Sequence, residues 1–251
     1  MTALLEARGL CRYYDGEAAV EDVDLTVAAG EIHALVGLNG AGKTTLMRML
    51  LGMARPDAGA GLLHGVDVRS RPDWSRVGAL IETPFAYPEL TVRENLAAAA
   101  RLHGVGEIGA AVTATLGRFG LERWADRRAR GLSLGNRQRL GLAAALVHGP
   151  SVLVLDEPAN ALDPAGVVFI RDLLREYAGA GAAVLVSSHH LDQLARVADV
   201  VTVLHRGRVV GHLDAAGADL EQAFFDLVAQ VDGVQVDGVQ VDGVQVTRRG
   251  P

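Results

Sequence analysis

Two patterns of apolar residues alternate along this chain. Short runs that are almost entirely apolar predict strands at residues 31–36, 76–81, 152–155, 183–187 and 199–204. Between them, apolar side chains recur at helical spacing and predict helices at about 42–53, 164–178, 190–197 and 217–229. Apolar strands that alternate with helices are typical of a parallel sheet buried on both faces, so the pattern predicts an α/β fold.

The beginning and the middle of the chain depart from this alternation. Residues 4–10 and 20–27 predict two strands joined by a loop at Asp15-Gly16, and we expect an antiparallel part there. Between residues 91 and 148 almost no strand pattern occurs. Thr91 to Glu94 matches a capping box, and further helical segments are predicted at about 107–119, 122–129 and 135–148. The core, about residues 1–230, is therefore expected to hold a helical insertion at about 84–148.

The end of the chain is repetitive. Val-Asp-Gly-Val-Gln occurs three times between Val231 and Gln245, with a period far shorter than that of solenoid repeats. Each Asp-Gly favours a turn, but too few residues separate the turns for ordinary hairpin strands. We expect residues 231–251 to form a disordered tail, with a small edge strand as the alternative.

Composition narrows the classes of function. The hydrophobic content of 49% supports a substantial core, and the net charge of −6 argues against a broad nucleic-acid surface. The only cysteine, Cys11, cannot form an internal disulfide, which fits a reducing cytoplasm. We find no signal segment and no apolar run of about 20 residues, the length needed to span a bilayer. The sequence therefore predicts a protein that is soluble, or that is attached to a membrane only through a partner.

The clearest chemical pattern follows the apolar run 31–36. The pattern G-x-x-x-x-G-K-[ST] of a phosphate-binding loop is matched by Gly37, Leu38, Asn39, Gly40, Ala41, Gly42, Lys43 and Thr44. Lys43 is the only lysine of the chain, and its compact ammonium can reach β- and γ-phosphates better than a planar guanidinium can. Thr44 is expected to bind Mg²⁺ and Thr45 the α-phosphate. A plain glycine turn is disfavoured, because the loop lies between a predicted strand and a predicted helix.

Two acidic residues follow the apolar run 152–155. Open α/β sheets bind ligands at the carboxyl ends of their strands, where Asp156 and Glu157 are expected. Asp156 is suited to hold Mg²⁺, and Glu157 is suited to orient and activate an attacking water. Adjacent acids also occur as solvated turn residues, but the phosphate loop elsewhere in the chain favours the functional reading.

The segment 132–139, Leu-Ser-Leu-Gly-Asn-Arg-Gln-Arg, carries a third pattern. Ser133 and the amides near Gly135 lie at the start of a predicted helix, where a γ-phosphate can bind; a plain serine cap is the alternative. Together with the two patterns above, this segment resembles the ATP-binding cassette (ABC) family, whose signature Leu-Ser-Gly-Gly-Gln precedes a Gln-Arg pair. Leu134 and Asn136 depart from that signature. The resemblance implies that the segment meets the nucleotide of an opposite subunit.

The resemblance covers about residues 3–229 and implies roles for further residues. Tyr14, with Tyr13 as its rival, takes the place of the aromatic side chain that stacks on adenine. Asp163 lies in the segment that signals across a dimer. His189 is preferred to His190 as the family's switch histidine, because it directly follows two serines.

One departure from the family concerns Glu82. The family usually has a glutamine at this position, where it contacts Mg²⁺ and the attacking water; a carboxylate is a good Mg²⁺ ligand but adds negative charge. The Ile-Glu-x-Pro form and the Ser-Leu-Gly of the signature resemble the bacitracin- and lantibiotic-resistance branch of exporters.

The function implied by the resemblance is that of an ABC transporter ATPase subunit, built on a P-loop NTPase core. Two such subunits, identical or related, would enclose two ATP molecules with Mg²⁺ and drive a separate permease from the cytoplasmic face of the membrane. The permease would dock at the loop after Glu82 and the helices to about residue 130, and the cargo could be an antibiotic, a peptide or a lipid. The alternatives are an importer ATPase, which often carries a regulatory domain after the cassette, and a soluble regulator, which usually has two cassettes or a coiled coil.

Overall fold

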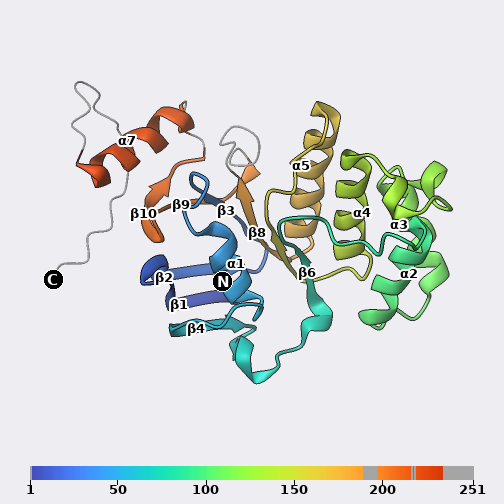
Figure 1. Ribbon diagram of the computed structural model, residues 1–251, viewed down its shortest axis with the longest axis horizontal. Coiled ribbons are helices and arrows are strands. Elements are labelled where there is room, and N and C mark those ends of the chain that lie inside the picture. Colours follow the sequence, from blue (N-terminus) through green and yellow to red (C-terminus); the bar gives the residue numbers. More distant parts are fainter. Residues whose placement is uncertain (1, 189–196, 216, 218, 234–251) are drawn as a thin grey trace.

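The computed structural model describes residues 2–188, 197–215, 217 and 219–233 (Figure 1). Its main sheet has six strands in the order β10-β9-β3-β8-β7-β6, parallel except for β10. The strands are β3 (Ile32–Val36), β6 (Val77–Leu80), β7 (Val152–Leu155), β8 (Ala183–Ser188), β9 (Val200–His205) and β10 (Arg208–Leu213). Every residue of β3, β7 and β8 is buried, as the continuous apolar runs predicted. The predicted α/β fold with a mainly parallel sheet is confirmed.

A second sheet of four antiparallel strands has the order β2-β1-β4-β5. Its strands are β1 (Ala3–Tyr14), β2 (Glu17–Ala28), β4 (Ala58–Leu63) and β5 (Val66–Asp67). The predicted turn between β1 and β2 has positive φ at both Asp15 and Gly16, as a two-residue hairpin requires. Sequence reasoning missed β4 because its two glycines obscure any alternation. Gly59 is needed there, since a Cβ at that position would overlap backbone atoms of β1.

The two faces of the main sheet are covered differently. Alternate residues of a strand point to opposite faces, so Val154 of β7 packs with helix α1 (Lys43–Leu50) and the second sheet. Leu153 and Leu155 lie on the other face, in a hydrophobic cluster that also contains residues of α4 (Leu134–Leu146), α5 (Pro164–Gly179) and α7 (Leu220–Asp232). The main sheet is therefore enclosed between two hydrophobic clusters.

The middle of the chain forms a helical group, to one side of the sheets in Figure 1. It contains α2 (Val92–Leu102), α3 (Ile108–Arg118) and α4, and the capping box at Thr91 and Glu94 is present. The helix predicted at 122–129 is wrong: only 3₁₀ turns form, at Glu122–Trp124 and Ala129–Gly131. The first amides of α2, Val92 and Arg93, donate to the carbonyls of Arg127 and Ala125, so a tertiary contact holds this segment out of a helix. The limits 84–148 and 1–230 stay predictions.

At the C-terminal end, β10 was not predicted. It returns beside β9 through a turn at Arg206-Gly207, where both residues have positive φ. Helix α7 continues to Asp232 and ends at a left-handed Gly233, so it includes the start of the first repeat. The helix predicted at 190–197 falls almost wholly outside the described residues, as does the tail after Gly233. Over the part of the chain that the structure describes, no helix has the length and apolar character needed to cross a bilayer.

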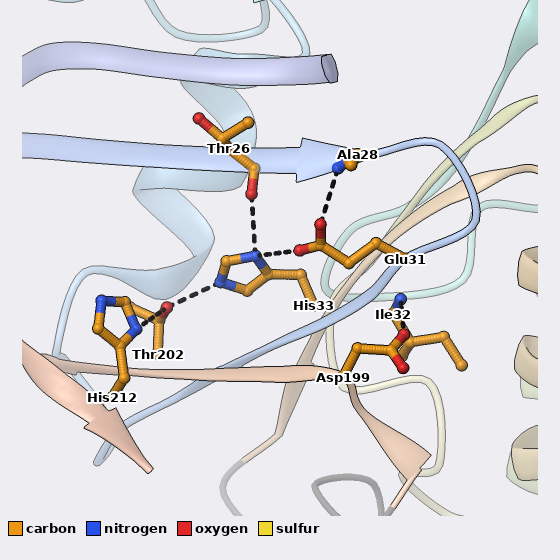
Figure 2. Close-up of polar contacts among 8 residues, drawn as sticks. All are labelled: Thr26, Ala28, Glu31, Ile32, His33, Asp199, Thr202 and His212. Atoms are coloured by element: carbon orange, nitrogen blue, oxygen red, sulfur yellow. Dashed lines mark hydrogen bonds and ion pairs between the residues drawn. The ribbon is translucent and has the colours of Figure 1, made fainter. Parts of the chain in front are cut away.

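A buried polar network joins the two sheets at the amino end of β3 (Figure 2). His33 Nδ1 lies 3.1 Å from both Glu31 Oε1 and the Thr26 carbonyl oxygen, so it must carry a proton to donate. His33 Nε2 lies 2.7 Å from Thr202 Oγ1, which is 3.0 Å from His212 Nδ1. Burial raises the pKa of Glu31, but hydrogen bonds from His33 and the Ala28 amide outweigh this and lower it overall. The phosphate loop follows β3 at its opposite, carboxyl end.

Candidate functional site

The loop between β3 and α1 has a backbone that only glycine permits at two positions. A Cβ at Gly37 would overlap the Leu204 carbonyl oxygen. Gly42 has φ +105°, and a Cβ there would overlap the carbonyl oxygen of Ala19. The strand, the glycine-rich loop and the helix therefore follow one another as the phosphate-loop pattern predicted.

Lys43 is folded back over this loop. Its Nζ donates to the carbonyl oxygens of Gly37 at 2.6 Å and Leu38 at 3.3 Å, and its side chain is 7% exposed. Burial lowers the pKa of Lys43, while the negative charges of Glu157 and Asp156 act in the opposite direction. The ammonium is therefore positioned beside two carboxylates and is able to turn toward an anionic ligand.

A cavity of about 210 Å³ lies where the loop meets the end of β7. It is lined by Ala19, Asn39, Gly40, Ala41, Gly42, Lys43, Thr44, Thr45, Asp156 and Glu157. The structure thus brings together six predicted loop residues and Thr45 with the two acidic residues, although more than 100 positions separate them in the chain. Backbone amides at the start of α1 and a buried ammonium make this cavity suited to a phosphate chain.

Asp156 is held by two hydroxyl groups. Thr44 Oγ1 donates to Asp156 Oδ2 at 2.7 Å, and Ser187 Oγ donates to Asp156 Oδ1 at 2.5 Å. A hydroxyl and a carboxylate that face one cavity are hard oxygen ligands of the kind Mg²⁺ prefers, so the donor set fits that ion. Sequence reasoning missed the contact of Ser187, because nothing local shows that β8 lies next to β7.

Glu157 has a strained backbone with φ +50°, an uncommon value for a residue other than glycine. Its amide donates to Ser187 Oγ at 2.9 Å, and its carboxylate lies 4.0 Å from Lys43 Nζ. Gln138 of α4, which is 4% exposed, donates to the carbonyl oxygen of the next residue, Pro158, at 3.0 Å. Contacts from β8 and α4 therefore hold this turn, and the role of Gln138 was also missed.

Glu82 takes a different position from the other predicted metal ligands. Its Oε2 accepts from Arg48 at 2.6 Å, its side chain is 53% exposed, and it is not among the residues that line the cavity. Its φ of +55° is again unusual for a non-glycine residue. Thr44 and Asp156 are in direct contact with each other, whereas Glu82 is paired with helix α1.

The residues of the third pattern lie outside the cavity. Ser133 caps α4 by accepting from the Asn136 amide at 3.3 Å. Asp163 caps α5, and its Oδ1 lies 3.3 Å from Arg139 of α4. A Cβ at Gly135 would meet the carbonyl oxygen of Ala161 at 3.0 Å. These contacts join the start of α4 and residues 161–163 into one surface region, and none of the residues that make them lines the phosphate cavity.

The remaining predicted site residues are a tyrosine for adenine stacking and a switch histidine. Tyr14 ends β1 and is 45% exposed, and the Arg12 guanidinium lies 4.7 Å from the centroid of its ring. The rival Tyr13 is similarly exposed, and its amide donates to Asp57. His189 and His190 lie outside the described residues.

Known proteins of similar sequence support one interpretation of this geometry. The ABC transporter family, represented by its sequence model, matches residues 20–160. The bacitracin transport ATP-binding protein of Enterococcus faecalis is 39% identical over 213 residues, which cover 84% of this chain and 69% of that protein. The lantibiotic transport ATP-binding protein of Streptococcus pyogenes is 31% identical over 222 residues, which cover 88% and 96%.

A solved structure agrees with the sequence relatives. The ATP-binding subunit of an ABC transporter superposes with a TM-score of 0.83 at 31% identity, covering 90% of this chain and 99% of that one. With nine tenths of the chain covered, the similarity is not confined to the residues around the cavity.

Proposed function

This chain belongs to the family of ABC transporter ATP-binding proteins and is an ATPase, and we propose that it powers export through a separate membrane permease. The observation that carries the proposal is the cavity in which Lys43, Thr44, Asp156 and Glu157 face one another. A nucleotide phosphate chain matches both the amides and the ammonium of that cavity.

Several side chains in and near the cavity then have roles in ATP binding and hydrolysis. Lys43 leaves its carbonyl partners and binds the β- and γ-phosphates, and Thr45 binds the α-phosphate. Glu157 orients the attacking water and accepts its proton, from the turn that Ser187 and Gln138 hold. Tyr14, at the exposed end of β1, stacks on adenine.

Mg²⁺ would be held by Thr44 and Asp156 and would neutralise negative charge on the phosphates. Glu82 could join it only after leaving Arg48, and His189 is the candidate for contacting the γ-phosphate. The Arg48–Glu82 ion pair supports a role in which Glu82 enters the site late. The pair keeps the additional carboxylate away from the phosphates until a conformational change breaks it.

A second copy of the chain, or a related ATPase, completes the site. Ser133 and Gly135 do not line the phosphate cavity of their own chain, although the start of α4 is suited to bind an anion. We therefore place them against the γ-phosphate of the partner subunit. Leu134 supports this arrangement, because this large apolar residue is 61% exposed at the start of the same helix. Asp163 lies on the same surface and would relay closure of the dimer.

The permease would dock on an apolar groove beside the helical group. A cavity of about 640 Å³ there is lined by 14 residues, among them Met53, Trp74, Ile81, Phe85 and His103. Phe85 is 72% exposed and Met53 is 64% exposed, which is unusual for large apolar side chains. The groove also includes Arg48, so a docked partner would touch the residue that holds Glu82.

The relatives name the kinds of transport for which this cassette type is used. The relatives from Enterococcus faecalis and Streptococcus pyogenes are described as bacitracin and lantibiotic transport proteins. We therefore propose an antibiotic, a peptide or a lipid as the cargo. The chain would then act at the cytoplasmic face of the membrane, with the permease as its anchor.

Substitution of Glu157 tests the proposal. Glu157→Gln keeps the shape of the side chain but removes the base, so ATP binding is expected to persist while turnover falls at least 100-fold. The trapped complex should elute as a dimer with ATP on size exclusion. Asp126→Asn, which neutralises an exposed carboxylate, is the control. Hydrolysis at the wild-type rate by Glu157→Gln would refute the role of Glu157, and wild-type protein that fails to bind ATP would refute the function.

A further inference from the structure

Ser187 is a buried residue whose hydroxyl contacts both acidic residues of the phosphate cavity. It lies on β8 beside the end of β7, and its exposed fraction is 0%. Its Oγ contacts the Asp156 carboxylate at 2.5 Å and the Glu157 amide at 2.9 Å. We propose that Ser187 is a positioning residue for hydrolysis, which orients Asp156 toward the metal and fixes the backbone of Glu157. This inference rests on the proposed function.

The direction of both hydrogen bonds follows from the donors available. The Glu157 amide can only donate, so it uses a lone pair of the Ser187 oxygen. The single hydroxyl proton is then free to point to Asp156 Oδ1. A hydroxyl that donates to a carboxylate makes a short, charge-assisted bond. Ser187 therefore links the two acidic residues through one oxygen atom.

The carboxylate of Asp156 has one hydroxyl donor on each oxygen. Thr44 supplies the donor to Oδ2 and Ser187 the donor to Oδ1. If the Thr44 hydroxyl turns to a metal ion, Ser187 still holds the carboxylate in its plane. Groups that hydrogen-bond to metal ligands in this way usually change metal affinity or activity by about 10–100-fold when removed.

The setting of Ser187 argues against a role in stability alone. The preceding residues of β8 are Ala183, Val184, Leu185 and Val186, all buried and apolar. A hydroxyl at the next fully buried position lowers stability unless it is hydrogen-bonded, and both partners of the Ser187 hydroxyl lie in the phosphate cavity rather than in the apolar core. What the hydroxyl adds is contact with the two residues on which the chemistry depends.

The test compares Ser187→Ala with a matched loss of another buried hydroxyl. Ser187→Ala removes a single oxygen, so the variant fits the same space. Thr202→Val is the control: Thr202 is 1% exposed, lies on β9 of the same sheet, and bonds to His33 and His212 at 2.7 and 3.0 Å (Figure 2). Ser187→Thr keeps the hydroxyl and serves as the rescue variant.

Two measurements on the purified full-length chain decide the matter. The first measures the affinity for a fluorescent ATP analogue, initially in EDTA and then as Mg²⁺ is added in a titration. The second measures the Mg²⁺ concentration that gives half-maximal ATPase activity. Ser187→Ala is expected to bind the analogue like wild type in EDTA but to need roughly 10-fold more Mg²⁺ in both assays. Thr202→Val should lower the melting temperature and keep the wild-type Mg²⁺ curve, and Ser187→Thr should restore that curve.

The proposal for Ser187 is overturned if Ser187→Ala keeps the wild-type Mg²⁺ dependence, or if Thr202→Val shifts it equally. A Ser187→Thr variant that folds but responds like Ser187→Ala would also overturn it. These outcomes differ from failure of the proposed function, in which wild-type protein itself neither binds the analogue nor hydrolyses ATP.

Discussion

The stacked pair of His103 and His148 predicts how stability depends on pH. The two rings lie 3.7 Å apart between centroids, with an angle of 3° between their planes. Burial, and next the neighbouring His103, lower the pKa of His148 from 6.5 to about 4, although a contact with the Val77 backbone acts in the opposite direction. Because the folded pKa lies below the unfolded one, the fold favours the neutral ring. This stability is fully present above about pH 6.5 and is lost as the pH falls toward about 4.

The size of the effect follows from linkage. A shift from 6.5 to about 4 corresponds to a loss of about 2 kcal/mol between pH 7 and pH 5. His148 is only partly buried, so solvent screening reduces this to about 1 kcal/mol. For a chain of this length, that loss lowers the melting temperature by about 2–4 °C.

The assay is thermal unfolding at pH 7 and pH 5, followed by circular dichroism, for wild type and His148→Phe. The phenylalanine ring keeps the stacking but does not titrate, so the variant should lose about 1 kcal/mol less than wild type on acidification. Burial and His33 also lower the pKa of His212, but that residue is present in both proteins and cancels in the comparison. His64→Asn removes an exposed histidine at a left-handed position and should behave like wild type. Equal acid sensitivity of wild type and His148→Phe would refute the reasoning.

Two further predictions concern the loop and the groove. Gly42→Ala should abolish ATP binding in a fluorescence titration, because the added Cβ would overlap the Ala19 carbonyl oxygen. Gly181→Ala is the control and should bind ATP normally, since Gly181 also has positive φ but faces open space. Normal ATP binding by Gly42→Ala would contradict the loop geometry. Phe85→Ser should reduce recovery of the permease in a pull-down about 10-fold or more while the ATPase activity of the isolated subunit persists. The exposed Val168→Ser on α5 is its control, and equal recovery with both variants would move the docking surface elsewhere.

Local sequence determined the parts of the site whose residues are neighbours in the chain. The run 31–36 continues into a glycine-rich loop and a helix because apolar burial, positive φ and helix propensity act within a few residues. The acids after 152–155 were placed correctly for the same reason, since a buried parallel strand must end at the ligand-binding edge. Similarity to a known family extended these patterns to Ser133 and Asp163, which cap helices in the structure.

Only the tertiary structure decided which contacts form between segments that are distant in the chain. The helix predicted at 122–129 does not form, because carbonyl groups of this segment accept hydrogen bonds from the first amides of α2. Strand β10 forms because a left-handed turn at Arg206-Gly207 directs the chain back along β9. Ser187 reaches Asp156 because β8 lies beside β7, and Arg48 reaches Glu82 because α1 packs next to the end of β6. Propensity and periodicity describe neighbours in sequence, whereas these contacts depend on strand order and helix placement, which the packing of the whole core sets.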